Sequence, residues 1–573
     1  MGSPSFGSPV LGLDLGSSNI KASFFDIVSG NYRFICASQT GGGNHTQNFD
    51  YCQAVQNAVS ALETKIGRIL LNSDGLVIVP VSADGYGVGR VVITCSSGPA
   101  IRVLLAGLLA DVSLASAVHL VELNYGEVVH QIGLFNQLPV VEQIDHVIRT
   151  KPDLLILAGG FDQGAESSQE NNIEIARLIC SVLPEYDRPI ILYAGNKKYA
   201  QYTSDTLSKL SLTRIASNLR PSYDIEDLNP AQHEMEEIVA EFRQKQSGSL
   251  QRLGKISETI PASSAHSFGR ALRFLSKCLD PQKGIMGIDI GTETTTIAAA
   301  KDGEINLRVL PYGMGEPLAS MTTPEDLSGI RHWLPPRISK QKVRDYLWQK
   351  SLYPGSIPAD SDSLAIEQAA AREIIQHAKA ELDGEFLSRD IEYGTILAGG
   401  SVLANAPSST QSLLMLLDGI EPIGIISIYL DRYAILSTMG AAAKSDQALP
   451  VQVLDSFLSE NLATVICPVS LVPSGIPILE VIVEYQDGKQ SAHVVKKGDL
   501  VQITIPTGLL ATIRVKTRFH TRLDAAGKLS ESSFQVRGGG LGVIIDGRGR
   551  PIVLPIIQGK RWLLLNKWYH SIK

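Results

Sequence analysis

The chain has 573 residues, of which 44% are hydrophobic and 19% are charged, and its formal net charge is −7. Because a domain typically takes roughly 100 to 200 residues, this length predicts three or four structural units rather than one. A net negative charge argues against a general nucleic-acid binder, so we expect no DNA or RNA partner.

The cysteines and the apolar segments indicate where the protein works. Six cysteines are scattered without a C-x-x-C pair, which favours reduced thiols over disulfides or a zinc site. The most apolar stretch, residues 103–120, is interrupted by Asp111 and predicts a buried helix rather than a transmembrane segment. Residues 1–9 contain neither a basic region nor a long apolar run, so we expect a disordered N-terminus without a secretory signal and a cytoplasmic protein.

One sequence motif occurs twice in the chain. Residues 10–27 read VLGLDLGSSNIKASFFDI and residues 284–303 read GIMGIDIGTETTTIAAAKDG. In each, β-branched and aromatic residues flank a turn too short to contain a crossover helix, which predicts strand, turn and strand. Asp14 and Asp289 then lie at the ends of strands, each followed by a glycine and hydroxyl residues.

The remaining pattern divides the chain into regions. Between the two copies of the motif, short apolar runs alternate with helix-like stretches, which predicts α/β segments with parallel strands. We expect these segments to be inserted into a first lobe formed by residues 10–283. Residues 284–447 form the expected second lobe, with mostly helical sequence between 324 and 390. From 448 to 573 closely spaced strands with glycine and proline turns predict a separate β-rich domain.

The first loop has the residue types of a phosphate-binding turn. Gly16 allows backbone N–H groups to approach phosphate oxygens, and Ser17 and Ser18 add hydroxyl donors. Lys21 on the next strand has the charge and reach to contact a β-phosphate. Asp14 is expected to face a hydrated Mg²⁺ ion.

The second loop supplies the opposite side of the same site. Mg²⁺ usually takes one or two protein carboxylates together with phosphate oxygens, so Asp14 and Asp289 on two facing loops suit Mg-ATP. The residues expected to close over the γ-phosphate are Asp289, Gly291, Thr292, Thr294 and Thr295. Glu293 and Thr294 are candidates, by position, for orienting an attacking water, and Asp14 and Asp289 complete the predicted catalytic group.

A third motif follows at residues 397–400, LAGG, with a helix start expected at Ser401. Gly399, Gly400 and Ser401 offer backbone against which an adenosine can lie. Any one of these motifs occurs by chance in long proteins, where aspartate and glycine often form ordinary turns. Three of them in this order, each at the end of an apolar strand, favour an ATP site.

This order resembles the actin, Hsp70 and sugar-kinase superfamily, which implies two RNase H-like lobes around a nucleotide cleft. Longer segments are similar to the glutamate mutase accessory family called GlmL or MutL, which is unrelated to mismatch repair. They are residues 95–118, 152–164, 188–200, 218–238 and 431–443. The resemblance covers about residues 10–445 and implies an ATP-dependent accessory or reactivating protein, chaperone-like, whose client is a cobalamin-dependent mutase.

The second loop departs from the pattern expected of that family. It reads GTETTT, with Glu293 and Thr296 where a small residue and an acid are expected, so the residues leave ATP hydrolysis undecided. The alternatives are therefore an actin-like structural or adaptor protein that binds ATP with little turnover and, third, a small-molecule kinase. The kinase would need a base for a substrate hydroxyl, and no acid between the loops stands out for that role.

Two other segments have open interpretations. A second LAGG, at residues 157–160, is either another nucleotide contact or a tightly packed βα turn. The aromatic and basic tail, residues 559–573, suits a membrane surface or a partner, but a final strand or helix packed on the β-rich region is favoured.

Overall fold

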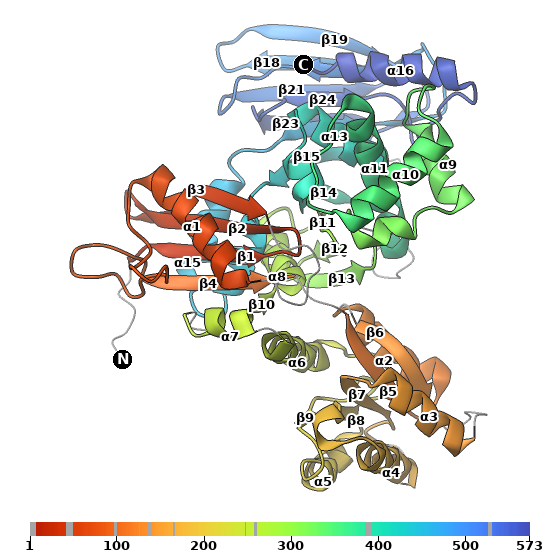
Figure 1. The fold of residues 1–573 in the computed structure, drawn as a ribbon. Coiled ribbons are helices and arrows are strands. Elements are labelled where there is room, and N and C mark those ends of the chain that lie inside the picture. The colour runs from red at the N-terminus through yellow and green to blue at the C-terminus, as the bar shows by residue number, and fades with distance from the viewer. Residues whose placement is uncertain are drawn as a thin grey trace. The chain divides into compact units, whose positions relative to one another are not determined.

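The computed structural model describes residues 7–41, 50–96, 100–124, 126–133, 139–163, 167–246, 248–256, 261–383, 391–524 and 530–573. Residues 1–6, in the N-terminal segment predicted to be disordered, lie outside the described part. The chain forms two compact units (Figure 1). One comprises Met1–Ser97 and Arg252–Lys573, and the other is the inserted segment Gly98–Gln251.

The first sheet of the larger unit has the strand order β10-β4-β1-β2-β3. The hairpin strands β1, β2 and β3 are antiparallel, whereas β4 and β10 continue parallel to β1. Helix α1 packs against β2 and β3. The bounds are β1 Val10–Leu15, β2 Asn19–Val28, β3 Asn31–Gly41, α1 Tyr51–Ile66, β4 Arg90–Cys95, β10 Ala262–Ser263 and α8 Ser264–Cys278.

The second sheet repeats this arrangement. Its order begins β13-β12-β11-β14-β15, with β11, β12 and β13 antiparallel and with β14 and β15 parallel to β11. The repeated topology confirms the predicted fold class of two RNase H-like lobes. The strands are β11 Gly284–Ile290, β12 Thr295–Lys301, β13 Glu304–Leu310, β14 Tyr393–Gly400 and β15 Gly424–Asp431.

Helices pack around the second sheet in the region predicted to be helical. Proline-rich breaks separate them as expected, because proline cannot continue a helix and disfavours helical backbone before it. They are α9 Pro324–His332, α10 Lys340–Leu352, α11 Ser361–Asp383, α12 Ser401–Ala404 and α13 Ser409–Ile420. Two later helices pack on the first lobe instead: α14 Ile435–Ala442 contacts α8 and β4, and α15 Ala448–Phe457 contacts β3. Leu347 of α10, Ile374 of α11 and Leu416 of α13 are completely buried in one core with Ile288 and Ile428 of the sheet.

The inserted unit is a doubly wound α/β domain with its own core. Its five strands are all parallel in the order β6-β5-β7-β8-β9, as the alternating pattern predicted. Its main elements are β5 Ile101–Ala106, α2 Ala115–Glu122, β6 Gly126–Ile132, α3 Val140–Thr150, β7 Leu154–Gly159, α4 Ser167–Val182, β8 Ile190–Gly195, α5 Ala200–Leu207, β9 Thr213–Ile215 and α6 Asn229–Gln246.

The C-terminal region is rich in strands, as predicted, but it is not separate from the second lobe. Strand β16 pairs with β15, β24 with β16 and β20 with β24, so the lobe's sheet grows to eight strands. This pairing covers the edge of β15, which would otherwise be unpaired. The bounds are β16 Ala463–Cys467, β17 Val469–Ser470, β18 Pro477–Tyr485, β19 Gln490–Lys496, β20 Leu500–Ile503, β21 Leu510–Thr517, β22 Thr521–Arg522, β23 Glu531–Arg537, β24 Val543–Asp546 and α16 Gln558–His570.

A second layer completes this region. The sheet β19-β18-β21-β23 packs through Val481, Val483 and Ile513 against Ile466 and Ile545 of the eight-stranded sheet. The aromatic tail forms helix α16, and Trp568 and Ile572 are buried in the core of the second lobe. This is the packed helix that the sequence favoured.

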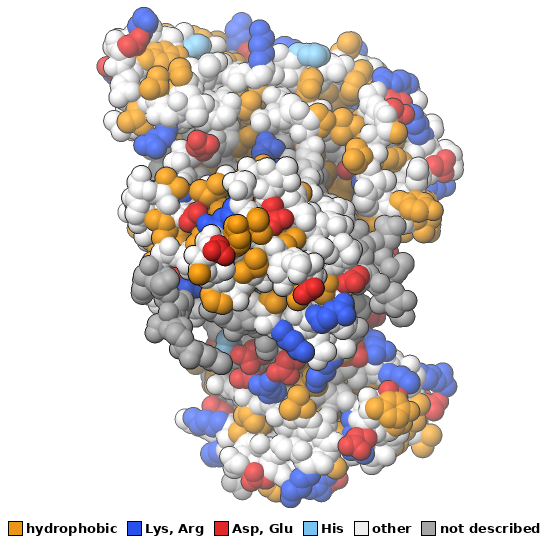
Figure 2. All heavy atoms as spheres, turned by 60° about the vertical axis from the view of Figure 1, so that its left-hand side comes forward, with side chains coloured by type: hydrophobic (Ala, Val, Ile, Leu, Met, Phe, Trp, Pro, Cys, Tyr) orange, Lys and Arg blue, Asp and Glu red, His pale blue; other side chains and the backbone are white. Residues whose placement is uncertain are grey.

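The surface carries charges of both signs. On the described part of the face drawn in Figure 2, lysine and arginine side chains lie among aspartates and glutamates. None of the described helices combines the length and the apolar character required to cross a bilayer.

Candidate functional site

The two predicted phosphate loops are built in the same way. In the turn from β1 to β2, Gly16 N–H donates to the Asn19 carbonyl at 3.0 Å, and in the turn from β11 to β12, Gly291 N–H donates to the Thr294 carbonyl at 2.8 Å. A Cβ atom on either glycine would lie 2.7 Å from that carbonyl oxygen. Both turns therefore require glycine, and the two copies of the repeated sequence motif form the same turn structure.

The three predicted motifs converge in the larger unit. The hydroxyl of Ser18 in the first loop forms a hydrogen bond with the hydroxyl of Thr292 in the second loop. Asn19 Nδ2 donates to Ser401 Oγ at 2.9 Å, which joins the first loop to the start of α12. Segments nearly 400 positions apart in the chain thus meet at one place, as the predicted ATP site requires.

Asp14 is held by hydroxyl groups from two other segments. It lies opposite Lys21 in the β1–β2 pair. Its Oδ1 atom accepts hydrogen bonds from Thr94 Oγ1 at 2.7 Å and from Ser264 Oγ at 2.9 Å. Both bonds use the same oxygen, so they orient the carboxylate while Oδ2 is used by neither.

Asp289 occupies the equivalent position in the second lobe. It lies in register with Thr296 of β12 and Gly399 of β14. Burial raises the pKa of Asp289 to about 6; Lys21 opposes this increase, whereas Asp14 and Asp431 add to it. The effect of Lys21 and Asp14 on Asp289 shows that the first and second loops share one electrostatic environment.

A third carboxylate, Asp431, was missed in the sequence. It ends strand β15 and accepts N–H bonds from Tyr433 at 3.1 Å, Ile435 at 2.9 Å and Leu436 at 2.8 Å. Burial raises its pKa, although these N–H donors and Lys21 favour the charged form. The signal was available, because an aspartate closing an apolar strand is the feature that identified Asp14 and Asp289.

The adenosine motif packs backbone against backbone. Gly400 ends β14 with φ +100°, and a Cβ atom there would lie 2.2 Å from the carbonyl oxygen of Ile290. On Gly399, a Cβ atom would lie 3.0 Å from Asp289 Oδ1. Helix α12 begins at Ser401, the residue at which the sequence predicted a helix start.

The remaining predicted residues lie in or beside these turns. Lys21 is 8% exposed on β2, and Ser17 lies partly buried in the first turn. Thr295 begins β12 fully buried, and its hydroxyl has no hydrogen-bond partner among the described residues. Glu293 and Thr294 lie partly buried in the second turn. Thr94, Ser264 and Asn19, which support the site, were not singled out in the sequence.

The second LAGG lies in the inserted unit. Gly159 ends β7 with φ +123°, and a Cβ atom there would lie 2.9 Å from Leu108 Cγ. Close packing at a βα turn thus accounts for a glycine at this position, which supports the structural interpretation of this motif.

Another group of potential metal ligands lies on α9 and α11. Asp326, Glu373 and His377 place their ligand atoms within 4.8 Å of one another. His377 Nε2 is 3.2 Å from Asp326 Oδ1 and 3.8 Å from Glu373 Oε1. Contacts of the His377 ring with these two carboxylates account for this arrangement without a metal.

The matches to known proteins cover most of the chain. No curated protein matches the sequence. The similar solved structures include nucleotide-free acetone carboxylase, with 11% identity, a TM-score of 0.34, and coverage of 86% of this chain and 81% of that one. Ethanolamine utilization protein EutJ from Carboxydothermus hydrogenoformans has 9% identity, a TM-score of 0.26, and coverage of 77% and 91%. Xylulose kinase from Bifidobacterium adolescentis has 10% identity, a TM-score of 0.26, and coverage of 76% and 93%.

The family model described as MutL protein matches residues 10–458, which is most of the chain. This match confirms the resemblance found in the sequence and extends through α15. The chain therefore belongs to the MutL protein family.

Proposed function

We propose that this protein is a Mg-ATP-binding accessory protein that acts as a nucleotide-dependent switch for a partner enzyme, such as a cobalamin-dependent mutase. The observation that carries the proposal is the meeting of the three loops through Ser18, Thr292, Asn19 and Ser401. Two glycine turns of identical construction and a glycine-rich strand end supply backbone N–H groups for phosphates and a surface for an adenosine.

The polar residues of the site fit this ligand. Asp14 and Asp289 are carboxylates on facing loops, and the Lys21 ammonium acts electrostatically on Asp289. This set of charges suits a divalent cation together with phosphate oxygens. Mg²⁺ bound with ATP would neutralise phosphate charge. The buried Thr295 hydroxyl, which has no partner among the described residues, is a further donor for the γ-phosphate side.

Each loop then has a distinct role. Gly16, Ser17, Ser18 and Lys21 bind the β-phosphate end. Gly291, Thr292 and Thr295 bind the γ-phosphate end, and Gly399, Gly400 and Ser401 contact the adenosine. Glu293 and Thr294 remain the candidates for orienting water.

The proposed switch follows from the fact that the two phosphate loops belong to different lobes. The Ser18–Thr292 hydrogen bond joins one lobe to the other, and a γ-phosphate that takes the hydroxyls of both loops replaces this bond. Nucleotide binding and release would therefore change how the two lobes are held together, a hinge transition. ATP and ADP differ in that phosphate, so they would favour different lobe arrangements.

The outer face of the β19-β18-β21-β23 sheet is the proposed client surface. Ile482 is 39% exposed and Val494 is 55% exposed on neighbouring strands of that sheet. Capture of a purified cobalamin-dependent mutase by the full-length chain, compared in ATP and in ADP, tests the partner. Capture that depends on the nucleotide and is lost with Ile482→Lys and Val494→Lys supports the proposal, whereas equal capture in all samples contradicts it.

A structural ATP-binder is the second candidate, since Thr296 stands beside Asp289 where the family pattern has an acid. Phosphate release from Mg-ATP, followed with and without the mutase, separates the two candidates. Release stimulated by the mutase supports the switch. Tight binding without release under both conditions supports the structural protein.

A further inference from the structure

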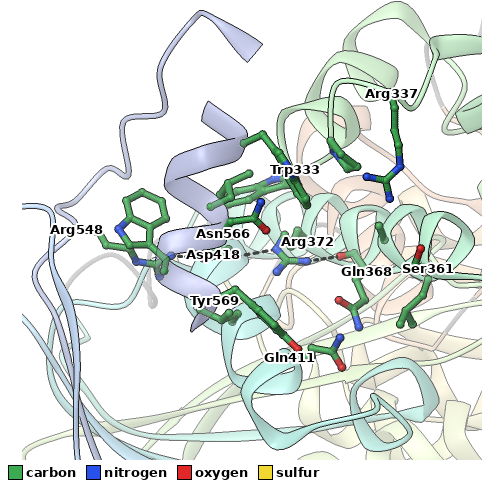
Figure 3. Close-up of a pocket in the computed structure, with 17 residues that line it drawn as sticks. Trp333, Arg337, Ser361, Gln368, Arg372, Gln411, Asp418, Arg548, Asn566 and Tyr569 are labelled. Carbon is green, nitrogen blue, oxygen red and sulfur yellow. Dashed lines mark hydrogen bonds and ion pairs between the residues drawn. The ribbon is translucent and has the colours of Figure 1, made fainter. Parts of the chain in front are cut away.

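A cavity of about 330 Å³ lies between α16 and the helices α11 and α13 of the second lobe (Figure 3). No residue that lines it belongs to the three nucleotide loops. Small-molecule sites in proteins typically have volumes of roughly 300 to 1,000 Å³, so the cavity has room for a compact ligand.

The walls of the cavity are aromatic. The chain contains four tryptophans, and three of them, Trp333, Trp562 and Trp568, line this cavity together with Tyr569. The Arg372 guanidinium lies 5.2 Å from the ring centre of Trp333, and that of Arg548 lies 4.9 Å from Trp568. Large flat side chains around a small space favour a planar ring.

A buried amide on the wall is unsatisfied. Gln368 is 8% exposed, and its Nε2 group has no hydrogen-bond partner among the described residues. Gln368 and Arg372 lie four positions apart on α11 and therefore share one face of that helix, which lines the cavity (Figure 3). A buried N–H donor without a partner is costly, and an acceptor group on a ligand would satisfy it.

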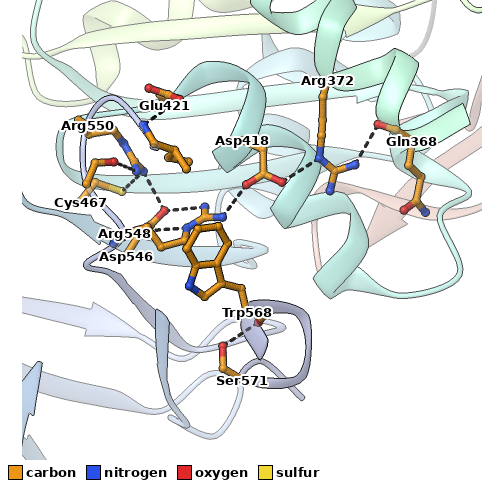
Figure 4. A network of polar contacts seen from close by, with 12 residues as sticks. Gln368, Arg372, Asp418, Glu421, Cys467, Asp546, Arg548, Arg550, Trp568 and Ser571 are labelled. Atoms are coloured by element: carbon orange, nitrogen blue, oxygen red, sulfur yellow. Dashed lines mark hydrogen bonds and ion pairs between the residues drawn. The ribbon is translucent and has the colours of Figure 1, made fainter. Parts of the chain in front are cut away.

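Positive charge is in excess next to the cavity. Asp418 accepts from Arg372 Nε at 2.8 Å and from Arg548 Nη1 at 2.7 Å, and Asp546 accepts from Arg548 and Arg550 (Figure 4). Three guanidinium groups thus share two carboxylates. Burial raises the pKa of the neighbouring Cys467 to about 12, so its thiol supplies no compensating charge at neutral pH.

We propose that this cavity binds a planar aromatic carboxylate, with its ring between the tryptophans and its carboxylate accepting from Gln368 Nε2 beside Arg372. The aromatic walls select a flat apolar body, and the unsatisfied donor and the excess guanidinium charge select an anionic acceptor. The site is independent of the proposed nucleotide site, because the two share no residue.

Calorimetric titration of the full-length chain with 2-naphthoate, without nucleotide, tests the proposal. We expect one molecule of 2-naphthoate to bind per chain. The affinity for the neutral 2-naphthamide should be lower by a factor of about ten or more. Quenching of tryptophan fluorescence should accompany binding, because three of the four tryptophans line the site. Absence of binding, or equal affinity for the amide and the acid, would overturn the proposal.

Two variants identify the site. Gln368→Leu removes the unsatisfied amide at similar volume and should weaken 2-naphthoate binding about tenfold. Trp348→Phe is the matched control, because Trp348 is 49% exposed on α10 and does not line the cavity, and its affinity should equal that of the parent chain. If Gln368→Leu folds poorly, Trp562→Ala replaces it, with the same expected loss. Unchanged affinity in the cavity variant would mean that the space is only a packing gap.

Discussion

Ser18 and Thr292, which are 274 positions apart in the chain, form a hydrogen bond through their side-chain hydroxyls. Each belongs to a strand–turn–strand loop that follows an aspartate and a glycine, so the bond joins two copies of one motif. Through this contact the two copies of the repeated sequence motif lie together at one site. It also ties the two lobes to each other.

Ser18→Ala tests the role of that contact. The variant loses one donor to the phosphates, so Mg-ATP affinity should fall by about 1.5–3 kcal/mol, or roughly 10- to 100-fold. The free energy of unfolding should fall by only about 1 kcal/mol, because one neutral hydrogen bond is lost. Calorimetry and thermal unfolding measure the two effects. Ser73→Ala, at an exposed turn position in the same unit, should change neither, and an unaltered affinity in Ser18→Ala would argue against a phosphate at this loop.

Gly400→Ala tests the backbone contact of the adenosine motif. The added methyl group would lie 2.2 Å from the Ile290 carbonyl, in a conformation with positive φ that alanine adopts poorly. We expect the protein to lose about 1–3 kcal/mol of stability or more, and to bind nucleotide weakly. Denaturant titration measures the loss. Gly355→Ala, where a Cβ atom would meet nothing within 4 Å, should be neutral, and equal behaviour of the two variants would refute the contact.

Asp289→Asn should stabilise the protein without nucleotide above pH 6. Because burial raises the pKa of Asp289 from 3.8 to about 6, the folded state binds more protons than the unfolded state between these values. The contribution of protonated Asp289 to the free energy of unfolding is therefore present at low pH and is lost as the pH rises through about 6. The shift corresponds to roughly 3 kcal/mol, and partial solvent exposure reduces it to about 1–2 kcal/mol.

Unfolding curves between pH 4.5 and 8 measure this effect. Asp302→Asn is the control, since Asp302 is exposed in a turn with φ 48°, a conformation that asparagine tolerates. If Asp289→Asn and Asp302→Asn respond equally to pH, the buried carboxylate is not the titrating group. Mg-ATP affinity of the parent chain should also decrease below pH 6, because a protonated Asp289 no longer attracts a cation.

Arg548→Met should destabilise the joint between the C-terminal region and the second lobe. The change leaves Asp546 and Asp418, both nearly inaccessible to solvent, without a main partner, and removing one member of a buried ion pair costs about 3–5 kcal/mol. Denaturant unfolding measures the loss. Arg514→Met breaks a half-exposed pair with Glu484 and should cost less than about 1 kcal/mol. Similar losses would show that the buried network adds no stability.

The loops could be predicted from the sequence because they are local. Asp14 and Asp289 each follow a short apolar strand and precede a glycine that the turn geometry requires, so a few adjacent residues carry the signal. The helix beginning at Ser401 was predictable for the same reason. Asp431 also ends an apolar strand, β15, but it was missed because no glycine turn follows it.

The pairings between distant segments could not be predicted. Strand β16 pairs with β24 although the four-stranded layer lies between them in sequence, and no local pattern indicates which strands become neighbours. The C-terminal region therefore appeared to be a separate domain. The hydroxyl donors Thr94 and Ser264 reach Asp14 from segments that carry no loop motif, so their role depends entirely on tertiary structure.

The nucleotide site itself is tested by calorimetric titration with Mg-ATP of the parent chain, Asp14→Asn, Asp289→Asn and the control Asp302→Asn. We expect one nucleotide to bind per chain in the parent and in Asp302→Asn, and affinity to be at least about 100-fold weaker in each of the other two variants. Equal binding by all four proteins, or no binding by the parent, would contradict the assignment of the three loops as a nucleotide site.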